Sequence, residues 1–334
     1  MLGRSGIRPD GGAPVTRPAR TDLSVRIGRL TLRNPVMPAS GTFAEGLDRV
    51  IDVNRLGAVV TKTITRELRT GNPLPRVVER PGGLINAIGI PSKGVTHFVE
   101  KTMPHDAAYD APLIVSISAP TPEGFARLAA ELTIPGVAGI EANISCPNIE
   151  EDGRAFAMRA DSTAAVTRQL RAATDLPLWV KLTPNTAEMP EVARAAQEAG
   201  ADAVVVANTI PSMAIDLRTF KPCLGNIMGG LSGPAVKPIV LRHVYLCAKA
   251  VTIPVIGCGG IGTAEDAAEY MLAGAAAVQV GTATFLQPAA MTTIIDGLEA
   301  FCAQRGIPRV ADLIGGVLTG EADEPDLAWM SAAP

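Results

Sequence analysis

The side chains that could do chemistry in this 334-residue chain lie in a few short segments. The most informative segment is Asn143-Ile144-Ser145-Cys146-Pro147-Asn148, in which a thiol stands between side chains that can donate and accept hydrogen bonds. A thiol has a reference pKa of about 8.5, so a nearby cation could bring Cys146 into the range for proton transfer. A reduced cysteine is otherwise a small buried apolar group. That second role is the one we expect for the remaining cysteines, which are Cys223, Cys247, Cys258 and Cys302.

Two lysines, Lys62 and Lys181, each end an otherwise apolar run. Burying an ammonium group without compensation is costly, so a lysine that points into a cavity generally has an anionic partner. Two other roles stay open, namely a Schiff-base nucleophile and a side chain that extends along the protein to reach solvent. The pair therefore indicates a binding site for an anion.

Glycine pairs form the third kind of segment. Gly259 and Gly260 lie in Gly257-Cys258-Gly259-Gly260-Ile261-Gly262-Thr263, just before a helix expected to begin near Ala264, and Gly281-Thr282 follows a later apolar run. Glycine lets backbone N–H groups approach an anion closely, and the start of a helix adds favourable partial charge. Such a loop can also be only a tight turn, but two of them together predict a phosphate site.

The order of apolar runs predicts the scaffold that positions these groups. From residue 35 onward, short β-rich runs alternate with longer helical stretches, which is typical of a parallel sheet. Glycine at Ala199-Gly200-Ala201 and Ala273-Gly274-Ala275 suits a helix C-terminus. Eight such strands favour a closed TIM (β/α)8 barrel over an open sheet, because closure removes both edges. The expected strands are 35–39, 57–62, 112–118, 137–145, 177–182, 202–208, 253–257 and 276–281.

In a barrel, the carboxyl ends of the strands share one rim, and that rim carries the active site. The segments above all fall at such ends, together with Ser40-Gly41 and Asn208-Thr209. Amides, hydroxyls, lysines, a thiol and paired glycines suit an anionic, planar ligand that forms hydrogen bonds. Two segments, 63–111 and 209–252, are too long for simple connections and are expected to build over the mouth of the barrel.

Composition sets the broader limits. Hydrophobic residues make up 47% of the chain, which supports a large core, and a formal net charge of −3 argues against nucleic-acid binding. The cysteines show no CxxC pair for a metal or an iron–sulfur cluster, and unpaired thiols fit a reducing cytoplasm. Residues 1–20 contain no apolar run long enough for a membrane helix, and we expect a loose tail followed by one catalytic domain over 21–334.

At residues 143–148 the chain also resembles the dihydroorotate dehydrogenases, whose base lies in a similar motif. Further matches follow in the right order over about residues 22–320. They are Pro38-Ala39-Ser40-Gly41, Gly71-Asn72-Pro73-Leu74-Pro75-Arg76, Asn86-Ala87-Ile88-Gly89-Ile90, Val180-Lys181-Leu182, Asn208-Thr209, Gly229-Gly230-Leu231-Ser232-Gly233-Pro234 and the two glycine pairs.

The resemblance implies a noncovalent FMN and a substrate, dihydroorotate or orotate, lying against it. The implied FMN contacts are Ser40, Gly41, Lys62, Thr63, Ser116, Asn143, Lys181, Ala207, Gly233, Gly259, Gly260, Gly281 and Thr282. Ser116 stands where related chains usually carry an asparagine. The implied substrate contacts are Lys62, Asn86, Ala87, Ile88, Gly89, Ile90, Asn143, Asn208 and Thr209, so the first insertion is predicted to be a substrate clamp.

The mechanism implied by the resemblance uses the Cys146 thiolate to take a proton from C5 of dihydroorotate while C6 passes a hydride to flavin N5. Lys62 and Lys181 complete the implied catalytic set, with Lys181 at the flavin N1/O2 edge. A cysteine base differs from the serine of the membrane-associated class. The clamp and the glycine-rich run look most like the catalytic subunit of the NAD-linked class, so the resemblance implies a homodimer core with a separate FAD and iron–sulfur subunit.

Three other functions are compatible with the same residues. A related flavin barrel could act on another pyrimidine, as dihydropyrimidine dehydrogenases do, because those enzymes also use a cysteine base. A phosphate-binding aldolase could use Lys181 as its Schiff-base lysine. A noncatalytic subunit could bind flavin without a substrate that reduces it.

Overall fold

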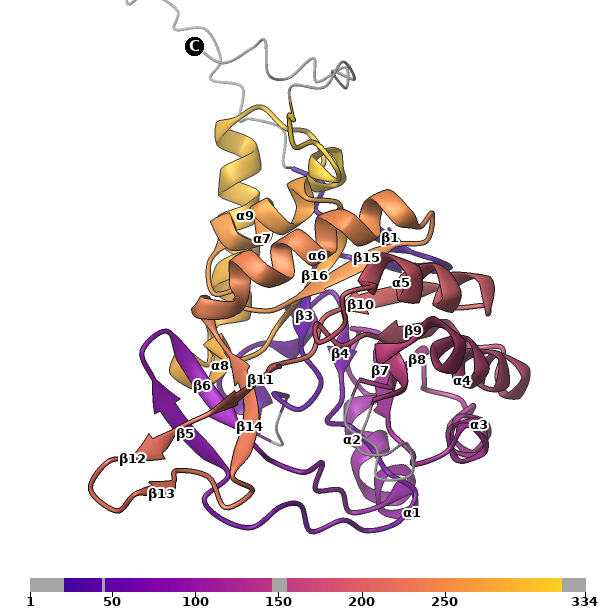
Figure 1. The fold of residues 1–334 in the computed structure, drawn as a ribbon. Helices are drawn as coiled ribbons and strands as arrows, with labels where there is room; N and C mark the ends of the chain where they lie inside the picture. Colours follow the sequence, from indigo (N-terminus) through magenta and orange to yellow (C-terminus); the bar gives the residue numbers. More distant parts are fainter. Residues whose placement is uncertain (1–20, 44–45, 146–154, 320–334) are drawn as a thin grey trace, which may run out of the picture.

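Eight parallel strands form the centre of the molecule in the computed structural model, which describes residues 21–43, 46–145 and 155–319. Their spatial order is β3-β16-β15-β10-β9-β8-β7-β4. The two end strands of this order, β3 and β4, are joined by a hydrogen bond in which Gly57 N–H donates to the Val36 carbonyl at 2.8 Å. This contact closes the sheet into the predicted barrel (Figure 1). The strands are β3 (Val36–Pro38), β4 (Val59–Val60), β7 (Leu113–Ile117), β8 (Gly139–Asn143), β9 (Leu178–Lys181), β10 (Ala203–Val206), β15 (Val255–Cys258) and β16 (Ala275–Val280).

Each of the eight strands lies inside or within one residue of a range expected from the sequence, so the fold prediction is confirmed. The helical ends are confirmed as well. Gly200 and Gly274 adopt φ values of 102° and 111° directly after α5 (Met189–Glu198) and α7 (Ala264–Leu272), a conformation that favours glycine. The predicted start of the helix near Ala264 is also correct.

Amphipathic helices pack around the barrel (Figure 1). In α3, for example, Phe125 and Leu128 are buried against the sheet, and the Thr121 hydroxyl caps the helix by accepting from Gly124 N–H. None of the helices in the described ranges is long and apolar enough to cross a membrane. The other outer helices are α4 (Ala160–Ala173), α6 (Lys237–Ala250) and α9 (Ala290–Gln304); α3 spans Pro122–Glu131, and the short helices are α1 (Val95–His97), α2 (Met103–Asp106) and α8 (Ala283–Leu286).

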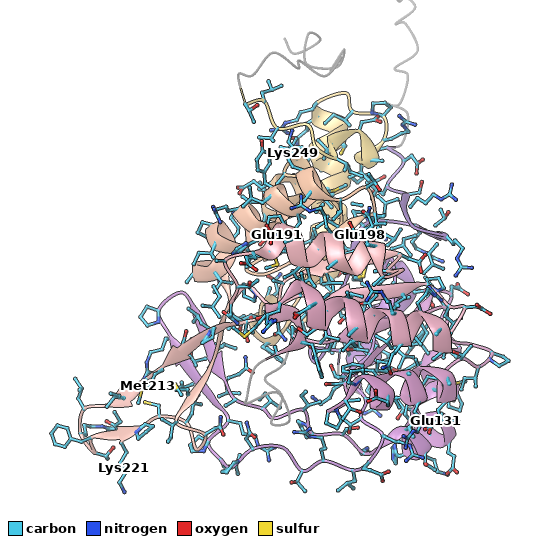
Figure 2. The ribbon with its side chains drawn as sticks, turned by 45° about the vertical axis from the view of Figure 1, so that its right-hand side comes forward. Glu131, Glu191, Glu198, Met213, Lys221 and Lys249 are labelled. Atoms are coloured by element: carbon cyan, nitrogen blue, oxygen red, sulfur yellow. The ribbon has the colours of Figure 1, made fainter. Side chains whose placement is uncertain are left out.

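The two long insertions meet in a second sheet that sequence reasoning did not predict. It has the order β11-β14-β6-β5 with antiparallel neighbours, so strands from both insertions pair with each other. Its strands are β5 (Val77–Arg80), β6 (Gly83–Asn86), β11 (Ile210–Met213) and β14 (Met228–Ser232). The shorter strands β12 (Ile215–Asp216) and β13 (Lys221–Pro222) extend from it as an arm away from the barrel, where Met213 and Lys221 lie (Figure 2).

Near the start of the described chain, β1 (Val25–Ile27) and β2 (Leu30–Leu32) form an antiparallel hairpin that packs on β16. Its apolar side chains Val25, Ile27 and Leu32 belong to the same hydrophobic core as the barrel strands. The inner sheet, the outer helices and this hairpin therefore share one core. A smaller apolar cluster of Ile85, Ala87, Ala214 and Leu224 lies under the added sheet.

Candidate active site at the barrel mouth

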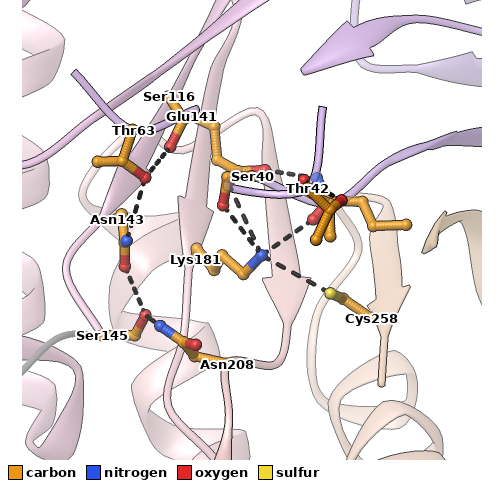
Figure 3. A network of polar contacts seen from close by, with 12 residues as sticks. Ser40, Thr42, Thr63, Ser116, Glu141, Asn143, Ser145, Lys181, Asn208 and Cys258 are labelled. Carbon is orange, nitrogen blue, oxygen red and sulfur yellow. Dashed lines mark hydrogen bonds and ion pairs between the residues drawn. The ribbon is translucent and has the colours of Figure 1, made fainter. Parts of the chain in front are cut away.

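Hydroxyl and amide side chains from four strand ends form one hydrogen-bonded chain at the rim. Asn143 Nδ2 donates to Thr63 Oγ1 at 3.4 Å, and Thr63 Oγ1 lies 3.0 Å from Ser116 Oγ. On the other side, Ser145 Oγ donates to Asn143 Oδ1 and accepts from Asn208 Nδ2, both at 2.7 Å (Figure 3). Thr63 and Asn208, which are 145 positions apart along the chain, thus belong to one row of hydrogen-bonded side chains, called the Thr63–Asn208 row below. The predicted convergence of these strand ends is confirmed.

Cys146, the predicted base, lies outside the described residues, as do Pro147 and Asn148. Ser145, which precedes Cys146 in sequence, is buried and belongs to the chain just described. The residues on the amino-terminal side of Cys146 are therefore held firmly at the rim.

Lys181 occupies the second cluster at the rim and is only 3% exposed. Its Nζ donates to Gln279 Oε1 at 3.1 Å, to Ser40 Oγ at 3.3 Å and to Cys258 Sγ at 3.6 Å (Figure 3). The carboxylate of Glu141 lies 3.9 Å from the same nitrogen. The sequence led us to expect the anionic partner of Lys181 in a ligand, whereas the protein itself supplies one.

Lys62, the other predicted lysine, is half-buried beside Thr63 at the end of β4. Desolvation by the surrounding protein lowers the pKa of its ammonium group. A bound anion would offset the free-energy cost of desolvating the ammonium group, because an opposite charge nearby favours the charged form of a lysine. Lys62 is therefore suited to hold an anionic group of a ligand.

The added sheet brings the predicted clamp to the same mouth. Asn86 ends β6, and its Nδ2 donates to the Gly230 carbonyl of β14 at 3.2 Å. Asn72 Nδ2 donates to the Ala87 carbonyl at 3.2 Å, while Gly89 and Ile90 adopt positive φ values of 77° and 51°. These contacts give the segment 86–90 a defined bend. The Ile88 carbonyl accepts from Asn72 N–H at 3.1 Å, which fixes the bend on its other side.

Gly230 explains how closely the sheet and the rim approach each other. A Cβ atom added at this glycine would lie 1.9 Å from Thr209 Oγ1, which is far inside any van der Waals contact. Thr209 follows Asn208 at the end of β10, and its N–H donates to Asn208 Oδ1 at 2.8 Å. The glycine-rich run of β14 is therefore needed to seat the sheet on the strand ends.

The glycine loops lie together, as predicted, although the details differ. An added Cβ at Gly260 would lie 2.8 Å from the Gly233 carbonyl, and one at Gly233 would lie 3.5 Å from Thr282 Cγ2. At Gly281 the nearest atom would be Ala39 Cβ at 3.5 Å, an ordinary van der Waals contact. The loops that contain Gly233, Gly260 and Gly281-Thr282 thus lie side by side at the rim.

The start of α7 is not free for the phosphate, contrary to the expectation from the sequence. Its own Asp266 accepts from Gly262 N–H at 2.9 Å and Thr263 N–H at 3.0 Å, and Thr263 completes a capping box. Lys237 Nζ lies 2.6 Å from Asp266 Oδ1 and offsets its charge. The groups left for an anion are therefore the loop positions Gly259, Gly260, Gly281 and Thr282.

Several of the predicted roles concern side chains that the structure also uses internally. The hydroxyl of Ser116 is fully buried and pairs with Thr63, so it supports the row, and its direct contact with a ligand stays a prediction. Ser40, Gly41 and Ala207 border the Lys181 end of the rim by their places after β3 and β10. Cys247 and Cys302 are the inert thiols that we expected, since burial raises the pKa of Cys247 to about 12 and that of Cys302 to about 11.

Glu141 and Gln279 were missed by sequence reasoning, which noted no carboxylate at the rim. The signal was present, because Glu141 interrupts an apolar run between Ile140 and Ala142, just ahead of the Asn143 motif. A charged residue at an alternating position of a barrel strand has to face the interior with its partners or face the helices. Its partner could not be read from the sequence.

Taken together, the site suits a planar ligand with a phosphate tail. The glycine loops would take the phosphate, Lys181 and the Thr63–Asn208 row would take polar ring edges, and Lys62 with the clamp would take a second, anionic molecule. In the part of the chain that the structure describes, no group of three His, Cys, Asp or Glu side chains could hold a metal ion.

Comparison with known proteins gives one consistent result. The profile of the family described as "Dihydroorotate dehydrogenase" matches residues 22–302. The chain is 49% identical over 298 residues to the "Dihydroorotate dehydrogenase B (NAD(+)), catalytic subunit" of Trichlorobacter lovleyi, an alignment that covers 88% of this chain and 98% of that relative. Relatives with the same description occur in Geotalea uraniireducens (46% over 303 residues, 90% and 99% covered) and Desulforamulus reducens (48% over 299 residues, 89% and 98% covered).

The hydrogen-bonded row yields a prediction for Ser145. Replacing it with alanine removes the hydrogen bonds to Asn143 Oδ1 and from Asn208 Nδ2, and two such bonds together contribute about 1–3 kcal/mol. We expect Ser145→Ala to lower the free energy of unfolding by that amount in urea titrations. The control is Ser212→Ala, which removes one hydrogen bond to the Ile210 carbonyl in the added sheet. Equal unfolding midpoints for Ser145→Ala and the wild type would contradict the supporting role.

Proposed function

The chain belongs to the dihydroorotate dehydrogenase family, and from this premise we propose that it oxidises dihydroorotate to orotate in pyrimidine biosynthesis, as the catalytic subunit of an NAD-linked enzyme. The observation that carries the proposal is the extent of the match, since the chain covers 98% or more of relatives that bear that description. The arrangement of the rim supports it independently, because the groups needed to hold a flavin and an anionic substrate lie side by side.

FMN is the proposed cofactor. Its phosphate would be held by the backbone N–H groups of Gly259, Gly260, Gly281 and Thr282, with Gly233 beside them, because the loops that carry these residues lie next to one another. Bound FMN supplies hydride acceptance at N5 for the hydrogen on C6 of dihydroorotate. Lys181 would hold the N1/O2 edge, because a fixed cation stabilises negative charge in a site that excludes water. Ser40 and Thr63 would flank the ring, with Gly41, Lys62, Ser116, Asn143 and Ala207 as the remaining proposed contacts.

The substrate would lie between the row and the clamp. Lys62 would hold its carboxylate, and the amides of Asn143 and Asn208 would hold its carbonyl and N–H groups, since amides both donate and accept. Asn86 and the segment 87–90 would cover it from the added sheet, together with Thr209. The dense hydrogen bonding already present at these side chains supports the proposal, because groups held in place do not need to be ordered when the substrate binds.

Cys146 is the proposed base. A thiolate at this position would remove the proton from C5, and a cation beside the sulfur would favour the thiolate over the thiol. The role rests on the motif in the sequence, because Cys146 lies outside the described residues.

Replacing the base tests the function directly. We expect Cys146→Ala to retain its yellow flavin spectrum, whereas anaerobic dihydroorotate should bleach it at least 100-fold more slowly than it bleaches the wild type. The measurement is single-turnover absorbance in a stopped-flow instrument. Cys223→Ala is the matched control, because Cys223 directly follows β13 of the arm, is half-buried, and its sulfur accepts from Arg80. An unchanged rate in Cys146→Ala would remove Cys146 from the mechanism, and a wild-type protein that dihydroorotate does not bleach would remove the proposed activity.

The lowered pKa of Lys62 gives a pH prediction for orotate binding. An anion binds the protonated ammonium more tightly than the neutral amine, so the affinity should be constant below the lowered pKa of Lys62 and should fall as the pH rises through it. For one linked proton, the loss is at most about tenfold per pH unit. Spectral titration of the FMN form with orotate measures it. Lys62→Met should bind orotate weakly and with no such fall; a wild-type affinity that rises over the same range would contradict the assignment.

The proposed assembly is a homodimer that forms the core of a heterotetramer with an FAD and iron–sulfur subunit. The printed description "catalytic subunit" of the relatives supports a partner. Leu217 and Phe220, on the arm formed by β12 and β13, are 78% and 85% exposed, which is typical of a surface that another chain covers. A cytoplasmic location belongs to the same proposal, since free thiols stay reduced there.

NAD reduction tests the partner. We expect the chain purified alone to transfer electrons from dihydroorotate to an artificial dye but to reduce NAD at less than about one hundredth of the rate seen after co-expression with the partner, because NAD chemistry needs the second flavin. Absorbance at the NADH band follows the reaction. Rapid NAD reduction by the isolated chain would contradict the need for a partner.

The aldolase alternative is not favoured by the surroundings of Lys181. A Schiff-base lysine attacks as the neutral amine, whereas this side chain lies in a buried cluster beside the Glu141 carboxylate, which favours the ammonium form. A flavin barrel for another pyrimidine is not favoured by the relatives, whose descriptions all name dihydroorotate.

A further inference from the structure

A carboxylate lies in the interior of the barrel below the proposed flavin site. Glu141 comes from β8 and has no exposed surface. Its Oε2 accepts from Gln279 Nε2, and Gln279 comes from β16, which is separated from β8 by three strands of the sheet. Side chains so far apart around the sheet can meet only by pointing across the barrel axis. Glu141 therefore faces the interior, on the same side as Lys181.

Gln279 connects Glu141 to Lys181 through opposite ends of one amide. Its Oε1 accepts from Lys181 Nζ at 3.1 Å, while its Nε2 donates to Glu141. The reverse orientation of the amide would set NH2 against the ammonium and oxygen against the carboxylate, so the charges on either side determine the orientation. The three residues form one connected unit (Figure 3).

Among the neighbours of Lys181 in the part of the chain that the structure describes, Glu141 carries the negative charge. Ser40 and Gln279 are neutral, and burial raises the pKa of Cys258, so its thiol is protonated at neutral pH. Glu141 Oε1 accepts no hydrogen bond from any described residue, although it lies 3.9 Å from Lys181 Nζ. The carboxylate thus acts on the lysine by charge and through the amide, not by direct hydrogen bonding.

Stability does not explain this carboxylate. Desolvating two charges costs several kcal/mol, and replacing a buried ion pair with apolar groups is often neutral or stabilising. A role in chemistry does explain it. A cation at the N1/O2 edge favours reduced flavin, which carries more negative charge there, and a carboxylate close behind that cation weakens the effect.

We propose that Glu141 is a positioning residue, which holds the Lys181 ammonium through Gln279 and offsets part of its charge, and so sets the reduction potential of the bound flavin. The inference rests on the proposed function, since it takes FMN as the group that Lys181 faces. The flavin reduction potential would thus be controlled in part by a side chain that does not touch the cofactor.

The test is the flavin midpoint potential of Glu141→Gln, measured anaerobically against reference dyes. Glutamine keeps the shape and can still accept from Gln279, but it removes the charge, so the potential should move in the positive direction while the FMN spectrum persists. Glu131→Gln is the matched control, because Glu131 pairs with Arg66 on the outer surface and its loss should leave the potential unchanged (Figure 2). An unchanged or more negative potential in Glu141→Gln overturns the inference.

A double variant covers the case in which Glu141→Gln does not fold or hold FMN. The double variant Lys181→Met/Glu141→Gln leaves no unpaired buried charge. Because the carboxylate offsets part of the lysine charge, removing both groups should lower the potential by less than Lys181→Met alone does. A double-variant potential at or below that of Lys181→Met overturns the inference. The proposed function is tested by different observations on the wild type: it would be contradicted if the protein bound no flavin, or if dihydroorotate did not reduce the bound flavin.

Discussion

The need to compensate one buried ammonium group organises the interior of this barrel. Lys181 is almost completely enclosed, and an isolated ammonium would not stay charged in such surroundings. Its nitrogen is therefore surrounded by a hydroxyl, an amide oxygen, a thiol and a carboxylate, which come from the segment after β3 and from β16, β15 and β8. Those strands must keep their register for the cluster to exist, so the electrostatics of one side chain and the closure of the barrel depend on each other.

A second constraint is the close approach of the added sheet. The two insertions pair through β6 and β14, whose partner residues are 144 to 148 positions apart, and this pairing lies directly on the strand ends. Gly83 would place a Cβ 1.9 Å from the Ser232 carbonyl, as Gly230 would against Thr209, so side chains are excluded at the contact. The sheet carries Asn86 and the following bend to the mouth, where they would cover a bound substrate.

The two halves of the rim differ in character. Around Lys181 the groups are charged or polarisable and deeply buried, which suits the stabilisation of charge on a cofactor. Between Thr63 and Asn208 they are neutral hydroxyls and amides linked in a row, which suits the recognition of carbonyl and N–H groups on a substrate. Asn143 belongs to the row and is also the direct partner of Lys181 on the neighbouring strand, because the two residues pair in the register of β8 and β9. The reaction would take place where the two halves meet.

The sequence by itself determined the eight strands, the glycines that end α5 and α7, and the gathering of polar groups at one rim. These features follow from local chemistry, because apolar alternation, glycine conformation and the direction of parallel strands act over a few residues. Only the tertiary structure decided that Glu141 and Gln279, 138 positions apart, meet beside Lys181, that Asp266 occupies the start of α7, and that two insertions build one sheet. These contacts depend on barrel closure and strand register, which bring distant residues together and leave no periodic pattern in the chain.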